Sequence, residues 1–288
     1  MTIKKLRQSQ SDNGRALQAP SLSPLRGEGC GNTFLIFDYL EDDLFDIENV
    51  TRKTHQILVK EDRDDALILK KEYEDDQKLV LTMIVLEPDG SIAEFCGNGA
   101  RVVSCYLHRK LGQKCFYLKT SRGMRRIWGQ NGMYHVEMGK TQLRSSRSKF
   151  LNPNLETFHL GLGMRQFTFY WTETLEPHLV TFDNIEEKEL RDLGLYLNHQ
   201  QRNFFPQGIN LNRVEIMSDN CLSVMTFERG VNRITAACGT GATSCVMLAQ
   251  AMGRIEKNDK IKVLLKGGTI LIHSKNGRTV MSGPASVE

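Results

Sequence analysis

Short apolar runs separated by charged or glycine-containing turns make up most of this chain. They cover residues 33–37, 66–69, 79–86 and 134–138 in the first half, and 167–171, 179–182, 222–227, 261–265 and 269–272 in the second. Runs of this kind, bounded by turn residues, predict β-strands. Residues 1–26 have no sustained apolar period, so we expect a loose N-terminal extension there.

Two segments have helical periodicity instead. The first follows Gly99 and ends at Gly112, with its apolar residues spaced by three or four positions. The second follows Gly241 and ends at Gly253. A glycine just after the last periodic residue is a usual end of a helix. Each segment therefore predicts one amphipathic helix of about three turns, which follows a group of strands.

The strongest organisational signal is a repeat where strand meets helix. Residues 94–100 read E-F-C-G-N-G-A and residues 236–242 read A-A-C-G-T-G-A, with the two cysteines 142 residues apart. Matching turns in matching contexts indicate a duplicated unit. We therefore expect an α+β fold with two facing halves, 27–140 and 141–275, and a last segment, 276–288, that can pack back on the first half.

Composition excludes several classes of protein. With 288 residues and 40% hydrophobic residues, the chain can bury a core without disulfides. The net charge of +4 is too small to imply a nucleic-acid surface. No apolar run approaches the roughly 18 residues of a membrane span. We expect neither a nucleic-acid nor a membrane partner, and the sequence leaves a homodimer open.

The seven cysteines are odd in number and widely spaced, without a C-x-x-C pair. This pattern argues against a secreted disulfide framework and against a structural zinc site. We therefore expect free thiols in a reducing cytoplasm. No sequence feature requires pyridoxal phosphate, a nucleotide or a metal, so we expect no cofactor.

Cys96 and Cys238 differ from the other cysteines because each begins a glycine-rich turn at a predicted helix N-terminus. The backbone amides there form an anion site suited to a carboxylate. The same field is expected to lower the pKa of a cysteine thiol and to favour thiolate. An isolated free cysteine is more often a small packing residue, which is what we expect of Cys105 and Cys245. The duplicated context favours chemistry for the first pair.

Two such thiols facing one another can invert a carbon centre. One thiolate takes a proton from the carbon, and the opposite thiol returns a proton to the other face. The amides of both helix ends can hold the carboxylate of an amino acid while negative charge develops on it. The expected partner is therefore a small-molecule amino acid.

Five segments together resemble the diaminopimelate epimerase family. They are G-N-T-F-L-I-F-D (31–38), D-G-S-I-A-E-F-C-G-N-G-A-R (89–101), P-H (177–178), E-R-G (228–230) and A-C-G-T-G-A (237–242). The resemblance runs from about residue 27 to 275. It implies two pseudo-symmetric domains, each a mixed β-sheet wrapped around a central helix, with the site in the cleft between them. It also implies pyridoxal-phosphate-independent interconversion of LL- and meso-diaminopimelate on the lysine and peptidoglycan pathway.

The resemblance implies a role for each matching residue. It implies that Cys96 and Cys238 are the acid/base pair and that the turn residues Gly97, Asn98, Gly239 and Thr240 hold the reacting carboxylate. It further implies that Asn32 and Asn210 bind the substrate, that His178 and Glu228 contact the reacting amino group, and that Arg229 binds the distal carboxylate. In isolation, a histidine after proline is usually a loop residue, and a Glu-Arg pair is usually solvated. Their order and spacing before the second cysteine turn favour the functional interpretation.

Two departures from the family pattern concern the substrate. Glu87 and Glu176 stand where the family usually has asparagines at the distal end of the substrate, and Lys60–Asp65 replaces a glycine-rich stretch. An ionised glutamate only accepts hydrogen bonds, and one glutamate at ~4 Å repels a carboxylate by about 4 kcal/mol at an effective dielectric of 20. Both glutamates favour a basic amino acid (lysine, arginine or histidine), whereas Arg229 favours a distal carboxylate.

Diaminopimelate remains the first substrate hypothesis, and racemisation of a basic amino acid is the alternative. Proline racemases and phenazine-pathway isomerases share the implied architecture, and the two cysteines favour the racemase chemistry. A non-catalytic amino-acid-binding homologue is a second alternative, against which the two intact cysteine turns argue. A zinc or thiol-redox protein ranks last because its cysteines would be more closely spaced.

Overall fold

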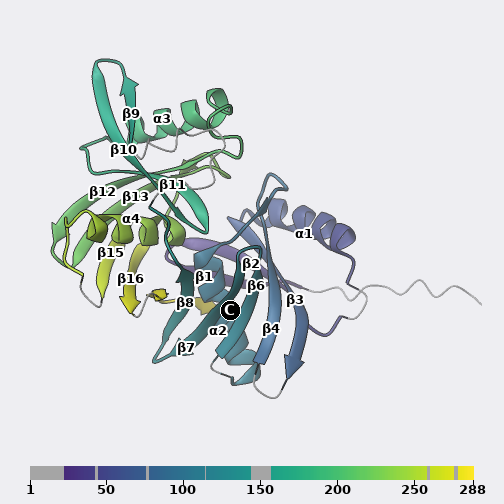
Figure 1. Ribbon diagram of the computed structural model, residues 1–288. Helices are drawn as coiled ribbons and strands as arrows, with labels where there is room; N and C mark the ends of the chain where they lie inside the picture. The colour runs from purple at the N-terminus through teal and green to yellow at the C-terminus, as the bar shows by residue number, and fades with distance from the viewer. Residues whose placement is uncertain are drawn as a thin grey trace, which may run out of the picture.

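The computed structural model describes residues 23–42, 45–75, 78–113, 115–143, 157–257, 260–275 and 278–288. Most of the expected N-terminal extension, residues 1–22, lies outside the described residues. The described chain forms two halves of similar architecture, each a β-sheet wrapped around one helix (Figure 1). The α+β fold class expected from the sequence is confirmed.

The first half contains two helices and the first eight strands. In chain order they are β1 (Leu25–Gly29), β2 (Asn32–Tyr39), α1 (Ile47–Glu61), β3 (Asp65–Asp75), β4 (Lys78–Leu86), β5 (Ile92–Ala93), α2 (Gly97–Leu111), β6 (Cys115–Thr120), β7 (Gly123–Gln130) and β8 (Met133–Gly139). The strands β2 and β3 pair in parallel, as do β4 and β6, while the other pairings in this half are antiparallel.

The second half repeats this order. It contains β9 (Thr157–Leu162), β10 (Arg165–Thr174), β11 (Glu176–Thr181), α3 (Glu187–Gln200), β12 (Asn210–Ser218), β13 (Cys221–Glu228), β14 (Arg233–Ile234), α4 (Gly239–Ala251), β15 (Ile261–Leu265), β16 (Gly268–Lys275), β17 (Arg278–Gly283) and β18 (Ser286–Val287). Its parallel pairs are β11–β12 and β13–β15, the counterparts of those in the first half.

The last two strands join the halves. β17 pairs with β16 on one side and with β8 on the other, and β18 pairs with β1. The C-terminus therefore lies against the first half (Figure 1). Because β1 begins at Leu25, two residues that we assigned to the loose extension are strand residues. Their backbone groups pair with β2, which explains why a polar and proline-rich flank ends in ordered structure.

Both helices predicted from the sequence are present at the centres of the two halves. In α2, every residue from Gly97 to Leu107 is buried, and α4 is buried almost throughout. The helix α2 ends as predicted, with Gly112 in the left-handed conformation (φ 68°) donating its N–H to the carbonyl of His108. Apolar side chains of both helices belong to one large core cluster with the inner faces of the strands.

The helices α1 and α3 were not predicted. They lie on the outside of the two halves (Figure 1), and α1 buries only Val50, Thr54 and Leu58, four residues apart, against a small cluster. A stripe of one residue per turn gives weak periodicity in α1, whereas α3 buries residues 190, 193, 194, 197 and 198, a pattern that does predict a helix. The local signals were the caps: Asp46 accepts from the first-turn amides of α1, and Glu186 and Glu189 form a capping box at α3. No helix in the described ranges is long and apolar enough to cross a membrane.

Candidate active site

The two cysteine turns have nearly the same backbone geometry. Cys96 (φ −123°, ψ 108°) is the N-cap of α2, and Cys238 (φ −125°, ψ 111°) is the N-cap of α4. The Sγ of Cys96 accepts the amide of Gly99 at 3.3 Å, and the Sγ of Cys238 accepts the amide of Gly241 at 3.4 Å. The sequence repeat is therefore a repeat of conformation.

The N-termini of α2 and α4 meet backbone to backbone. A Cβ atom added to Gly97 would lie 3.6 Å from the Cα of Gly239, with Met281 Cε at 3.0 Å on another side. The side-chain amide of Asn98 donates to the carbonyl of Ala237 at 2.9 Å and so links one turn to the other. A Cβ on Gly239 would lie only 2.6 Å from Met281 Sδ, so Met281, packed beside the two helix ends, leaves no room for a side chain there.

Four backbone amides are available at this meeting point. The first intrahelical donors are Ala100 and Ala242, which donate to the carbonyls of the two cysteines. The amides of the first two residues of each helix, Gly97 and Asn98 in α2 and Gly239 and Thr240 in α4, lie before the first intrahelical bond, while the third amides donate to the two thiols. Together with the two helix dipoles, they form an anion site suited to a carboxylate.

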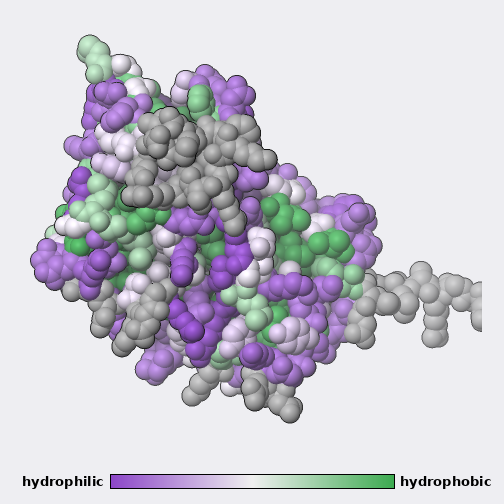
Figure 2. Space-filling model, in the orientation of Figure 1, coloured by the Kyte–Doolittle hydropathy of each residue, from purple (hydrophilic) through white to green (hydrophobic). Residues whose placement is uncertain are grey.

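A cavity of about 470 Å³ opens onto these turns, between the two halves. Of the thirteen residues predicted for the site, twelve line it: Asn32, Glu87, Cys96, Gly97, Asn98, Glu176, Asn210, Glu228, Arg229, Cys238, Gly239 and Thr240. Strongly hydrophilic residues gather in the middle of the molecular face shown in Figure 2, between the halves. The thirteenth residue, His178, is fully buried and does not line the cavity.

The expectation that the helix N-termini lower the thiol pKa values is wrong for the unliganded site. Burial raises the pKa of both thiols well above the usual value, and a nearby carboxylate adds to the rise: Asp65 beside Cys96 and Glu228 beside Cys238. The amide hydrogen bonds act in the opposite direction and are weaker. In a buried site crowded with carboxyls, removing a thiol proton is unfavourable.

Glu228 has the pKa of a group that can exchange protons near neutrality. Burial raises its pKa to about 7, against the hydrogen bond that Thr235 donates to it and a further one from Cys238. Its carboxyl therefore lies beside the second thiol with both protonation states accessible.

His178 reaches the second thiol through Thr240. Asn212 donates its side-chain amide to His178 Nδ1 at 3.1 Å and to the carbonyl of Leu179, while its Oδ1 accepts from Thr226. Because Nδ1 is an acceptor, the neutral ring carries its proton on Nε2, which donates to Thr240 Oγ1 at 3.1 Å.

Two consequences follow from this chain of hydrogen bonds. The Thr240 hydroxyl is left to donate its own hydrogen to Cys238 Sγ, which lies 3.4 Å away. Burial, together with the charge of Arg229, lowers the pKa of His178 to about 3, so the ring stays neutral at ordinary pH. His178 therefore lies behind Thr240 and contacts the second thiol only through it.

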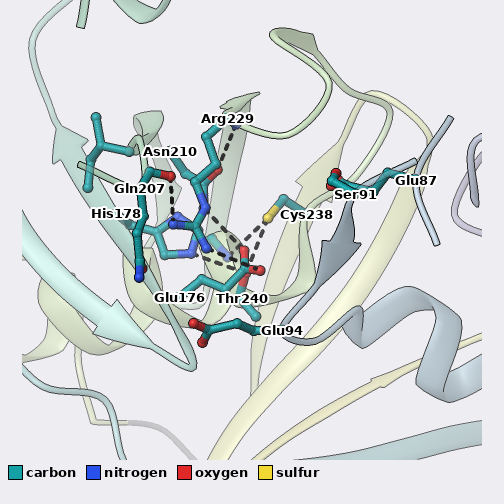
Figure 3. A network of polar contacts seen from close by, with 12 residues as sticks. Glu87, Ser91, Glu94, Glu176, His178, Gln207, Asn210, Arg229, Cys238 and Thr240 are labelled. Atoms are coloured by element: carbon teal, nitrogen blue, oxygen red, sulfur yellow. Dashed lines mark hydrogen bonds and ion pairs between the residues drawn. The ribbon is translucent and has the colours of Figure 1, made fainter. Parts of the chain in front are cut away.

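The far side of the cavity combines acidic and basic groups (Figure 3). The guanidinium of Arg229 lies 3.8 Å from a carboxylate oxygen of Glu176 and donates to the carbonyl of Gln207 at 3.1 Å. Asn210 connects the same groups, because it donates to Glu176 at 3.3 Å and accepts the backbone amide of Arg229 at 2.9 Å. Glu87 lies apart from this group and accepts the hydroxyl of Ser91 at 2.6 Å.

Several lining residues were not predicted from the sequence. The polar ones are Asp65, Asp89, Ser91, Glu94, Arg202, Gln207 and Asn232. Asp65 begins β3 and is the last residue of the Lys60–Asp65 stretch that we noted only as a departure, and Glu94 lies two residues before a cysteine. Both positions were visible, but nothing local indicated which way their side chains point. In the described part of the chain, no group of three or more His, Cys, Asp or Glu side chains is arranged to hold a metal ion.

Comparison with known proteins finds the diaminopimelate epimerase family, which the sequence motifs resemble, over both halves of the chain. The sequence profile of the family described as diaminopimelate epimerase matches residues 171–288. Diaminopimelate epimerase of Carboxydothermus hydrogenoformans is 30% identical over 277 residues, which cover 91% of this chain and 96% of that protein. The Bacillus subtilis enzyme of the same name is 33% identical over 215 residues, or 70% of this chain and 75% of that protein.

Solved structures show the same fold. A hydroxyproline epimerase from Agrobacterium vitis superposes with a TM-score of 0.65 at 14% sequence identity, over 92% of this chain and 88% of that one. At this identity the likeness concerns the fold alone, and it agrees with two similar halves that face one another across a site.

Proposed function

Because this chain belongs to the diaminopimelate epimerase family, and is thereby an isomerase, we propose that it inverts a free amino acid at its α-carbon by two-base catalysis between Cys96 and Cys238. The observation that carries the proposal is the pair of cysteine N-caps with matching geometry at two helix ends that meet in one cavity. The reaction needs no cofactor, since both proton carriers belong to the chain.

The substrate carboxylate binds the free amides of the two helix ends, and Glu228 binds the α-ammonium group. A thiolate on one face of the α-carbon takes its proton, and the C–H electron pair is left on the carbon and delocalised into the carboxylate. The four amides stabilise this developing charge. The thiol on the opposite face then donates its proton to the carbon, so one C–H bond breaks and one forms, without any redox change.

The bound ammonium also makes the first step easier. It places a positive charge beside the carboxyl groups that raise the pKa of the thiols in the unliganded cavity. Glu228, with a pKa of about 7, is ionised when it pairs with the ammonium, and the charge of that pair then no longer opposes ionisation of Cys238. Substrate binding and formation of the thiolate are then coupled, which keeps the thiols protonated in the empty enzyme.

Two substrates are candidates. The names of the relatives, and the presence of Arg229, favour LL-diaminopimelate, converted to meso-diaminopimelate for lysine and peptidoglycan synthesis. The glutamates that line the cavity, Glu87 and Glu176, favour a basic amino acid.

The test of the reaction class follows the α-proton. The reduced protein is incubated in deuterium oxide with single amino acids, and loss of the α-proton signal is measured by NMR. We expect exchange with at least one of LL-diaminopimelate, lysine, arginine and histidine. Folded, reduced protein that exchanges none of them contradicts the proposal.

A further inference from the structure

The charge of the cavity is unbalanced for a substrate with a second carboxylate. Its lining contains two guanidinium groups, those of Arg202 and Arg229. It contains six carboxyl groups: Asp65, Glu87, Asp89, Glu94, Glu176 and Glu228. The α-ammonium and α-carboxylate of a zwitterionic amino acid together bring no net charge. The excess of carboxyl groups over guanidinium groups is therefore balanced only if the side chain of the substrate is cationic.

Both guanidinium groups already have acceptors. Arg229 is held between Glu176 and the carbonyl of Gln207. Arg202 donates to the carbonyls of Asn198 and Pro206. A carboxylate arriving at Arg229 would also meet Glu176, whose oxygen lies 3.8 Å from the same guanidinium. At an effective dielectric of about 20, this repulsion offsets most of the attraction.

The acidic groups are less fully compensated. Glu94 lies 3.9 Å from Arg122, which is outside the cavity lining. Glu87 accepts the neutral hydroxyl of Ser91, and the charge of Arg229 acts on it more weakly than burial does. A cation between Glu87 and Glu176 would be attracted by two carboxylates drawn from opposite halves of the molecule.

The cavity also has room for a long side chain in this direction. A second hollow of about 730 Å³ shares Glu87, Asp89, Gly230 and Asn232 with the first. Glu87 therefore lines both hollows, at the edge where they meet. A short substrate side chain would not reach Glu87.

Burial makes both carboxyl groups costly to ionise on their own. Burial raises the pKa of Glu87 and of Glu176; the charge of Asp89 adds to the rise at Glu87, and the charge of Glu87 adds to the rise at Glu176. Carboxyls buried close together resist ionisation, and a bound cation removes that penalty.

We infer that the distal part of this cavity binds the cationic side chain of a basic amino acid of the lysine or arginine class, held between Glu176 and Glu87. The inference rests on the proposed racemase chemistry and names its substrate class. Glu176 and Glu87 are then specificity residues, while the paired thiols are unchanged in role.

The test compares amino acids of similar length that differ in the distal group. L-lysine carries an ammonium, L-norleucine a methyl group and L-2-aminoadipate a carboxylate, and LL-diaminopimelate carries both charges. The α-proton exchange of the reduced enzyme is measured with each. We expect kcat/KM for lysine to exceed that for norleucine and aminoadipate by at least about tenfold, as for a desolvated charge pair.

Three outcomes are distinguishable. Exchange of norleucine as fast as lysine overturns the cation site and leaves the proposed reaction intact. Faster exchange of aminoadipate or LL-diaminopimelate than of lysine overturns it as well. No exchange with any amino acid overturns the inference together with the reaction on which it rests.

Variants locate the effect. Glu176→Gln and Glu87→Gln should each lower the ratio of kcat/KM for lysine over norleucine by roughly tenfold, mainly through KM. The ratio is internal to each variant, so a loss of folded protein cancels. Glu215→Gln, at an exposed position of β12, is the matched control and should leave the ratio unchanged. An unchanged ratio in both site variants refutes the assignment.

Discussion

Replacing Thr240 by valine tests whether the chain of hydrogen bonds behind Cys238 supports its thiolate. The substitution keeps the branched shape of the side chain and removes the hydroxyl. That hydroxyl accepts from His178 at 3.1 Å and lies 3.4 Å from Cys238 Sγ, as a donor. Since Asn212 fixes the ring tautomer, the other groups of the chain cannot replace the lost donor.

The expected effect follows from the hydrogen bond that is lost. A hydrogen bond to a charged group contributes about 1.5–3 kcal/mol, and the long distance to sulfur places this one near the lower end. A loss of ~1.5 kcal/mol in thiolate stability lowers kcat/KM by roughly tenfold. It also raises the pKa of the thiol, so the acidic limb of the pH–rate profile should move up by about one pH unit.

The assay is α-proton exchange in deuterium oxide across a range of pH, with folding checked by thermal denaturation. Thr243→Val is the matched control. Thr243 is buried in the same helix and donates to the carbonyl of Gly239, away from the thiol. Equal profiles for the two variants would refute the role of Thr240 as donor, even if both were slower than the parent enzyme.

Three further outcomes are expected. Cys96→Ser and Cys238→Ser should each lower kcat/KM by about 10³-fold or more, because a serine hydroxyl is far less acidic than a thiol, and full exchange activity in either would contradict two-base catalysis. Gly239→Ala should lower stability by about 1–3 kcal/mol in urea denaturation, because its Cβ would lie 2.6 Å from a methionine sulfur, whereas Gly161→Ala, with nothing nearer than 3.9 Å, should change it little. Glu228→Gln should abolish most exchange and yet stabilise the fold at pH 8 by up to about 3 kcal/mol. The pKa of this carboxyl is about 7 in the folded chain, against an ordinary 4.5. The ionised group therefore opposes folding above pH 7, and this penalty disappears as the pH falls to 4.5. An equal gain in stability of the variant at pH 8 and pH 4.5, measured by urea denaturation, would show the reasoning wrong.

Much of the fold followed from local patterns. The strands were indicated by short apolar runs, and the two central helices by periodicity and closing glycines. The outer helices were missed for different reasons: α1 buries one residue per turn, whereas α3 buries residues 190, 193, 194, 197 and 198 at ordinary helical spacing, a signal that the sequence did contain. The joining of β17 to β8 is a contact across 140 residues, which no local pattern contains.

The candidate site was predicted more completely than its electrostatics. A repeated turn identifies Cys96 and Cys238 because conformation at a glycine-rich helix start is set by neighbouring residues. The shift of the thiol pKa was predicted in the wrong direction, since burial and the carboxyls of Asp65 and Glu228 outweigh the helix field. How deeply a thiol is buried, and which charges from distant segments lie beside it, depend on tertiary packing and cannot be read from the local sequence.

The sequence by itself determined that the chain is duplicated, that each half presents one thiol at a helix N-terminus, and that the distal positions carry glutamates. These are local facts, because they depend on residues a few positions apart. The tertiary structure decided that the two helix ends meet, that His178 is hydrogen-bonded to Thr240, and that Arg229 is already paired with Glu176. Each of these depends on which side chains from distant segments share one buried cavity, where charges interact strongly because water is excluded.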